Sequence, residues 1–135
     1  MTEVAGIKGT ALDTRIKNSM LTDPVLQAEL TGDEFRAFVN LTCWVVSLVS
    51  DGVFNGYQAE LLVPHLDRPK IHRFVELGLI DADDAGNCLM APEYWQWQST
   101  RDQIERMAEK RRKDRERKAE WRQRNAEDTQ PQQPW

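Results

Sequence analysis

The feature that most constrains the fold of this chain is a sharp change of composition near Thr100. Before it, apolar residues recur at the spacings of helices and strands. After it, the chain is almost entirely charged and contains no helix breaker before Pro131. Residues 1–100 hold 7 Lys/Arg and 14 Asp/Glu, a net charge of −7, whereas residues 101–124 hold 11 and 6, a net of +5. The sequence therefore predicts an acidic folded domain followed by a net-basic helix.

The same break divides the chain into four segments. We expect residues 1–20 to be loosely ordered, residues 21–98 to form one small domain, and residues 99–126 to form a charged helix that Ser99 or Thr100 caps. Residues 127–135 are of low complexity, and we expect them to be disordered.

The pattern of apolar residues argues against a membrane or secreted protein. No apolar run approaches the roughly 18–20 residues that a membrane-spanning helix needs. The first residues lack the basic and apolar regions of a secretory signal. Cys43 and Cys88 lie among apolar residues without a pairing pattern, so we expect buried free thiols. These features predict a cytoplasmic protein with no membrane contact.

Within the domain, periodicity and capping residues predict a series of short elements. Helices are expected over 24–30, 33–50, 57–63 and 69–77, an extended piece at 53–54, and strands over 79–83 and 88–91. The helix over 33–50 is the central one, because its second half is apolar nearly all round. Leu61 and Leu62 are expected to face inward. The fold class is mostly α with a small β-hairpin, an α+β fold.

The order of these elements is that of a winged helix-turn-helix. The diagnostic stretch is RFVELGLID, in which a short helix ends at Gly78 and leads straight into a hairpin. A small α+β domain with no role in DNA binding would give the same pattern.

Four stretches also resemble a family of actinobacterial phage and prophage proteins. They are GDEFRAFVNLTCWVVSLVSDGVF, FVELGLID, YWQWQST and QIERMAEKRRKDRERKAEWR. Together these resemble the N-terminal winged-helix modules of phage replisome organisers and replication initiators, over about residues 20–125. The resemblance implies a DNA-binding protein that acts in replication initiation or gene regulation. It implies double-stranded DNA as partner, together with host or phage replication proteins.

The helix over 69–77 is the predicted recognition helix. Its apolar residues Ile71, Phe74, Val75 and Leu77 should pack inward. Arg68, Lys70, Arg73 and Glu76 should face outward, with His72 near the edge. The candidate DNA contacts are Arg68, Lys70, His72 and Arg73. Arg and Lys are the side chains that hold phosphates and read guanine edges. The alternative is a short helix with ordinary solvated charges.

The charged helix is the second candidate site. Ile104, Met107 and Ala108 give one apolar turn, and Trp121 stands alone as a base-stacking residue, a docking residue or a cover for alkyl stems. The candidate DNA contacts are Lys110, Arg111, Arg112, Lys113, Arg115, Arg117, Lys118, Arg122 and Arg124. The alternative is a self-paired helix, because Glu109–Lys113, Arg112–Glu116 and Asp114–Lys118 have favourable spacing.

Other features favour a different partner and no catalysis. Asp81, Asp83 and Asp84 place three carboxylates at the wing, where phosphate would be repelled. The alternative function is therefore a protein–protein adaptor with an acidic body and a charged arm. His65 and His72 have no ligand-spaced partner, and no phosphate loop or nucleophile motif is visible, so we predict no enzyme, cofactor or metal site. The pattern does not predict an oligomeric state.

Overall fold

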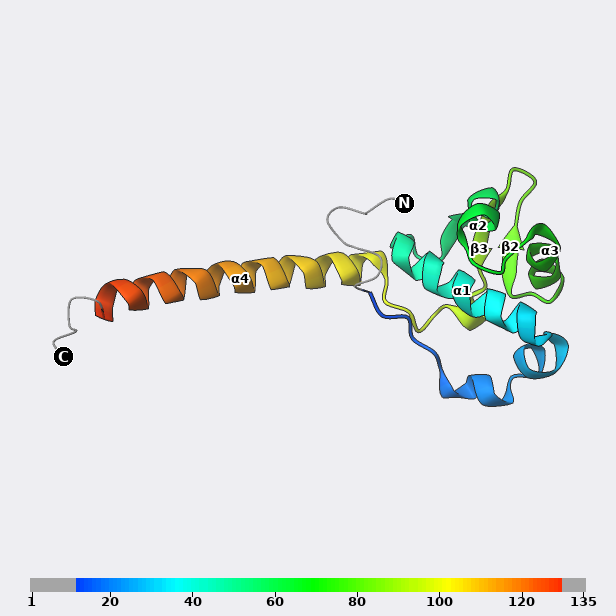
Figure 1. The fold of residues 1–135 in the computed structure, drawn as a ribbon, viewed down its shortest axis with the longest axis horizontal. Helices are drawn as coiled ribbons and strands as arrows, with labels where there is room; N and C mark the ends of the chain where they lie inside the picture. Colours follow the sequence, from blue (N-terminus) through cyan, green and yellow to red (C-terminus); the bar gives the residue numbers. More distant parts are fainter. Residues whose placement is uncertain (1–11, 130–135) are drawn as a thin grey trace. The chain divides into compact units, whose positions relative to one another are not determined.

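The computed structural model describes residues 12–129 of the 135-residue chain. Its elements are a 3-10 helix (Asn18–Thr22), a π-helix (Val25–Glu29), α1 (Gly32–Leu48), β1 (Val53–Asn55), α2 (Gly56–Leu62), α3 (Arg68–Glu76), β2 (Ile80–Ala82), β3 (Asn87–Met90), a 3-10 helix (Pro92–Tyr94) and α4 (Arg101–Thr129) (Figure 1). The chain divides into two compact units between Arg101 and Asp102. We call the first unit the body and describe α4 by itself.

The fold class is the predicted one: mostly helical, with a small antiparallel sheet and a long C-terminal helix. The predicted hairpin is formed by β2 and β3, in which Ile80 pairs with Met90. The structure adds β1 to this hairpin, because Val53 pairs antiparallel with Leu89 of β3. The sheet therefore has three strands in the order β1-β3-β2.

Local signals set both ends of α1. The Glu34 N–H donates to the Thr31 hydroxyl (3.1 Å), and the Thr31 N–H donates to the Glu34 carboxylate (2.9 Å). This capping box satisfies two backbone donors at the start of the helix. The helix ends at Val49, which has a left-handed φ of 53°. Its buried residues are Ala37, Phe38, Leu41, Trp44, Val45 and Val46, so α1 lies at the centre of the core, as predicted.

Aromatic contacts tie the other elements to α1. The rings of Phe38 on α1 and Phe74 on α3 meet edge to face, with centroids 5.5 Å apart. Phe38 also meets Tyr94 at 6.1 Å, and Trp44 meets Phe54 of β1 at the same distance. Edge-to-face pairs of this kind add to the stability that burial supplies.

The ends of α2 and α3 lie close to where the sequence predicts them, but the predicted buried side of α2 is wrong. Asn55 caps α2 by accepting from the Gln58 N–H (3.0 Å). The inward face of α2 is made by Gly56, Ala59 and Val63, a spacing that turns the next two leucines outward. Leu61 is 84% exposed and Leu62 51% exposed, so the prediction that they face inward is wrong.

On α3 the cap is Asp67, which accepts from the Lys70 N–H (2.9 Å), and Gly78 closes the helix with a φ of 75°. Ile71 and Phe74 are buried, as predicted. Val75 is exposed, contrary to the prediction. The buried side of this short helix consists of Ile71 and Phe74, and the residue after Phe74 points away from it.

The N-terminal segment is more ordered than we expected, in its described part. The Arg15 N–H donates to the Gln98 side-chain oxygen (3.0 Å), and the Gln98 amide donates back to the Arg15 carbonyl (2.8 Å). The Trp97 indole N–H donates to the same carbonyl (3.2 Å). Arg15 therefore fixes this segment, which we expected to be loose, to the last residues of the body. Residues 1–11 lie outside the described residues.

The burial of the cysteines and the end of the last helix differ in part from the predictions. Cys88 is buried, but Cys43 is exposed on α1, so only one of the two expected buried thiols is buried. Burial raises the pKa of the Cys88 thiol. The helix expected to end near residue 126 runs to Thr129, and the remainder of the expected disordered tail lies outside the described residues. In the described part of the chain, no helix has the length and apolar content to cross a bilayer.

We expect a chain that ends at Arg101 to unfold cooperatively, with a melting temperature within a few degrees of the full chain. The reason is that every residue of the buried cluster lies before Arg101. Circular dichroism melts of the two chains measure this. As a control, Phe74→Ala in the shortened chain should lower the free energy of unfolding by about 3–5 kcal/mol, because it empties the centre of the core. A shortened chain without a cooperative transition would contradict the prediction.

Candidate nucleic-acid interface

Arg68, the first candidate DNA contact, is engaged by its own body. Its guanidinium donates two hydrogen bonds to the Glu60 carboxylate, at 2.8 and 3.2 Å, and lies 5.7 Å from the centre of the Tyr57 ring. The Tyr57 ring in turn lies against Gly86 of the wing turn, where a Cβ would come within 2.4 Å of it. The hydrogen bond with Arg68 lowers the pKa of Glu60. Arg68 thus links α3 to α2 and the wing turn.

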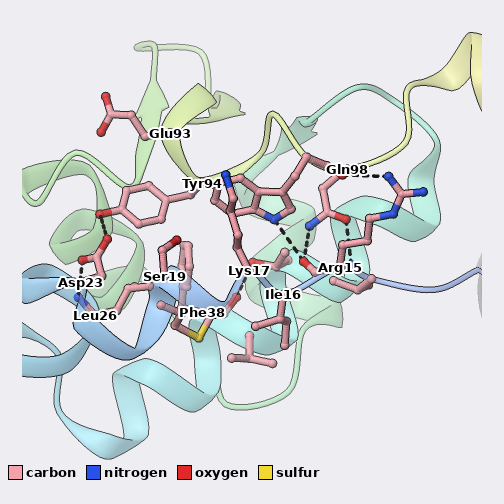
Figure 2. Close-up of a pocket in the computed structure, with 15 residues that line it drawn as sticks. Arg15, Ile16, Lys17, Ser19, Asp23, Leu26, Phe38, Glu93, Tyr94 and Gln98 are labelled. Atoms are coloured by element: carbon pink, nitrogen blue, oxygen red, sulfur yellow. Dashed lines mark hydrogen bonds between the residues drawn. The ribbon is translucent and has the colours of Figure 1, made fainter.

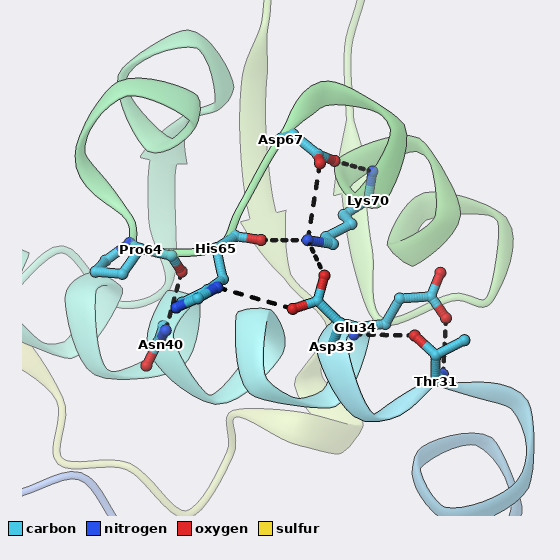
Figure 3. A network of polar contacts seen from close by, with 8 residues as sticks. All are labelled: Thr31, Asp33, Glu34, Asn40, Pro64, His65, Asp67 and Lys70. Carbon is cyan, nitrogen blue, oxygen red and sulfur yellow. Dashed lines mark hydrogen bonds and ion pairs between the residues drawn. The ribbon is translucent and has the colours of Figure 1, made fainter.

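Lys70, the second candidate, is held in a network of oxygen atoms (Figure 3). Its ammonium lies 2.6 Å from the Asp33 carboxylate, 2.5 Å from the His65 carbonyl and 3.7 Å from the Asp67 carboxylate. The side chain is only 15% exposed. The hydrogen bond with Lys70 lowers the pKa of Asp33. The expectation that Lys70 faces outward is therefore wrong: it connects α3 to the first turn of α1.

Arg73, the third candidate, also reaches back toward the preceding elements. It donates to the Glu29 carbonyl (3.0 Å) and lies 3.7 Å from the carboxylates of Glu29 and Glu34. All three Lys/Arg side chains of α3 are therefore paired with carboxylates of the body. His72 is exposed and is the fourth candidate. The helix thus presents no unpaired Lys or Arg, which sequence alone did not reveal.

The acidic turn between β2 and β3, the predicted wing, has a structural role. The Asp83 carboxylate accepts from the backbone N–H groups of Ala85 and Asn87 (both 2.9 Å) and from the Asn87 amide (3.1 Å). These bonds lower the pKa of Asp83, because they favour the ionised form. Asp83 therefore holds the turn, while Asp81 and Asp84 are exposed. A phosphate near this wing would meet three negative side chains.

On α4, ion pairs cover only some of the basic residues. Arg112 contacts both Glu109 and Glu116 at 2.5 Å, and Arg117 pairs with Asp114. The predicted Arg112–Glu116 pair is confirmed, whereas Asp114 pairs with Arg117 instead of Lys118. The remaining candidate contacts are exposed and form no salt bridge within residues 12–129: Lys110, Arg111, Lys113, Arg115, Lys118, Arg122 and Arg124.

Four of these cations form one line, which we call the basic stripe: Arg111, Arg115, Lys118 and Arg122. At 3.6 residues per turn, their spacing places them within about 60° of the helix circumference. The same rotation gathers six of the eight acidic residues of α4 on the opposite side: Asp102, Glu105, Glu109, Glu116, Glu120 and Glu127. The spacing of the four cations, alternately four and three residues, accounts for this separation.

A small cavity lies between the N-terminal segment, α1 and residues 93–98 (Figure 2). It has a volume of about 70 Å³ and mostly apolar walls. The Tyr94 hydroxyl at its edge donates to the Asp23 carboxylate (3.0 Å), and the Lys17 ammonium lies 5.4 Å from the centre of the Trp97 ring. Burial, with Asp23, raises the pKa of Tyr94 to about 12. Because the cavity is small and Tyr94, Asp23 and Gln98 in its wall are hydrogen-bonded within the body, we assign the cavity to the packing of this segment.

The described residues bring no three His, Cys, Asp or Glu side chains together as a metal site. Comparisons with protein-family models, curated proteins and solved structures give no match. The features of the structure that bear on function are therefore the basic stripe and the paired cations of α3.

We expect Asp33→Asn to lower the melting temperature at pH 7 by roughly 1–4 °C, because the α1–α3 contact loses its charge. Contact with Lys70 lowers the folded-state pKa of Asp33 below its ordinary value of 3.8. The stabilisation is therefore present above pH 3.8 and is lost as the pH falls through the lowered value. The deficit of the variant should shrink on acidification, in thermal melts from pH 7 to pH 3.

Asp81→Asn is the matched control, since Asp81 is exposed and its carboxylate has no hydrogen bond or ion pair among the described residues. Lys70→Gln, alone and combined with Asp33→Asn, completes a double-mutant cycle. Additive losses in this cycle would show that the ion pair contributes nothing of its own.

Proposed function

We propose that this chain is a DNA-binding winged-helix protein of phage or prophage type, in which α4 makes the principal contacts with phosphates. The observation that carries the proposal is the basic stripe, four cations that form no salt bridge with any described residue and that lie opposite six of the eight acidic residues of α4. Such a line of charge suits a polyanion, because binding releases condensed counterions.

The topology of the body supports the winged-helix part of the proposal. The order α1, β1, α2, α3, β2, β3 and the strand order β1-β3-β2 are those of this fold. In a winged helix, α3 is the element that enters the major groove. Here its cations are already paired, so the body would contribute less to affinity than α4 does. His72 remains as an exposed polar residue on α3.

The biological setting follows from the same proposal. Double-stranded DNA is the partner, and the role is replication initiation or gene regulation, with host or phage replication proteins as further partners. The role is not enzymatic. The cytoplasm is the proposed location, and the free thiols of Cys43 and Cys88 suit a reducing compartment.

A protein–protein adaptor is the second candidate, and one surface favours it. Tyr57, Leu61 and Leu62 on α2 are all at least half exposed, and an exposed apolar group beside an acidic surface suits a protein partner. Under this alternative, the paired cations of α3 stabilise the body and nothing in it contacts DNA.

We expect Arg115→Gln to weaken binding to a random-sequence duplex and to reduce the slope of log affinity against log salt by about 1, because one phosphate contact is lost. Arg112→Gln changes the net charge equally but removes a residue that Glu109 and Glu116 already engage. Its effect on the slope should be less than half as large. Fluorescence anisotropy at several salt concentrations gives both slopes.

The chain ending at Arg101 provides the second comparison, with a slope shallower than that of the full chain by roughly 2–4. Equal slopes for the full and shortened chains would exclude α4 as a DNA contact and would favour the adaptor.

A further inference from the structure

Trp121 on α4 is a large apolar side chain without a structural role. It is 61% exposed. Among the described residues its ring has no aromatic neighbour and no cation placed over its face, although such contacts exist for Tyr57 and Trp97. Removing aromatic surface from water lowers the free energy, so an exposed indole with free faces suits contact with a ligand.

The surroundings of Trp121 are basic. The indole borders a shallow hollow on the surface of α4, together with Asp114, Arg117, Lys118 and Arg124. Arg117 and Lys118 lie one turn before Trp121, and Arg124 lies one turn after it. Asp114, the one acidic residue of the hollow, is paired with Arg117. An anionic backbone that crosses the indole therefore meets a cation on either side.

We propose that Trp121 is a base-stacking platform and that this part of α4 binds single-stranded nucleic acid. An indole face can stack on a base only where that base has left its own stack, since a duplex presents base edges and not base faces. Lys118 and Arg124, which form no salt bridge with any described residue, hold the phosphates on either side of the stacked base. Lys118 belongs to both this hollow and the basic stripe, so the single strand would continue along the stripe.

This inference rests on the proposed function, because both need α4 to contact nucleic acid, but it names a single strand as an additional ligand. An apolar groove in a protein is the competing partner for Trp121. The charge around the indole disfavours it, since three cations would have to lose water on entering such a groove.

The test compares full-length Trp121→Ala and Trp121→Phe with the unaltered chain, on oligo(dT) and on a random-sequence duplex. Trp121→Ala should weaken oligo(dT) binding by about 5- to 150-fold, the range of a lost base stack, and should change duplex binding by less than about twofold. Trp121→Phe keeps a ring and should recover most of the loss. Oligo(dT) should also quench tryptophan emission in the unaltered chain, and this quenching should be reduced in Trp121→Phe.

Each other outcome has a separate meaning. Salt-dependent duplex binding with unchanged oligo(dT) binding in Trp121→Ala would overturn the stacking site and leave the proposed function standing. Equal losses on both ligands would reduce Trp121 to a general support of α4, which circular dichroism would reveal as lost helicity. No binding of either ligand by the unaltered chain would overturn both proposals. A change of sedimentation mass in Trp121→Ala, with oligo(dT) binding unchanged, would assign the indole to an interface between copies.

Discussion

The edge-to-face contact between Phe38 and Phe74 is the interaction on which the body depends. Phe38 lies on the central helix, Phe74 is completely buried on α3, and Tyr94 joins the same cluster. The ion pairs of Lys70 with Asp33 and of Arg73 with Glu34 connect the same two helices. Lys70 and Arg73 therefore reinforce the α1–α3 contact that the two rings make, and this explains why they pair with carboxylates of α1.

The elements of the fold were predictable because their signals are local. Thr31, Asn55 and Asp67 cap the helices that follow them, and Gly78 ends α3, all within a few residues of the boundary that each one sets. The order of elements and the fold class follow from these boundaries. The pairing of β1 with β3 was not predictable in this way, because the partners are more than thirty residues apart.

The candidate site was harder to predict, because a side chain's function depends on its partners in space. A cluster of Arg and Lys suggests a contact with phosphate. In the structure, however, Arg68 pairs with Glu60 and Lys70 with Asp33. Neither pair can be predicted from the spacing of residues on α3. On α4 the opposite holds. An isolated helix has only its own neighbours, so the basic stripe and the acidic side could both be derived from the sequence by rotation alone.

The lateral separation of charge on α4 has a consequence for how the helix meets a polyanion. Six of the eight acidic residues of α4 lie on one side of the helix and the basic stripe on the other, while the remaining Lys/Arg are spread around it. This uneven distribution gives the helix a dipole moment across its axis, distinct from the backbone dipole along it. Under the proposed function, the field of a polyanion would exert a torque on this moment and turn the carboxylates away before any contact forms. The helix would arrive already oriented, with Lys118 and the neighbouring Trp121 on or beside the leading side. Salt would weaken this steering at long range.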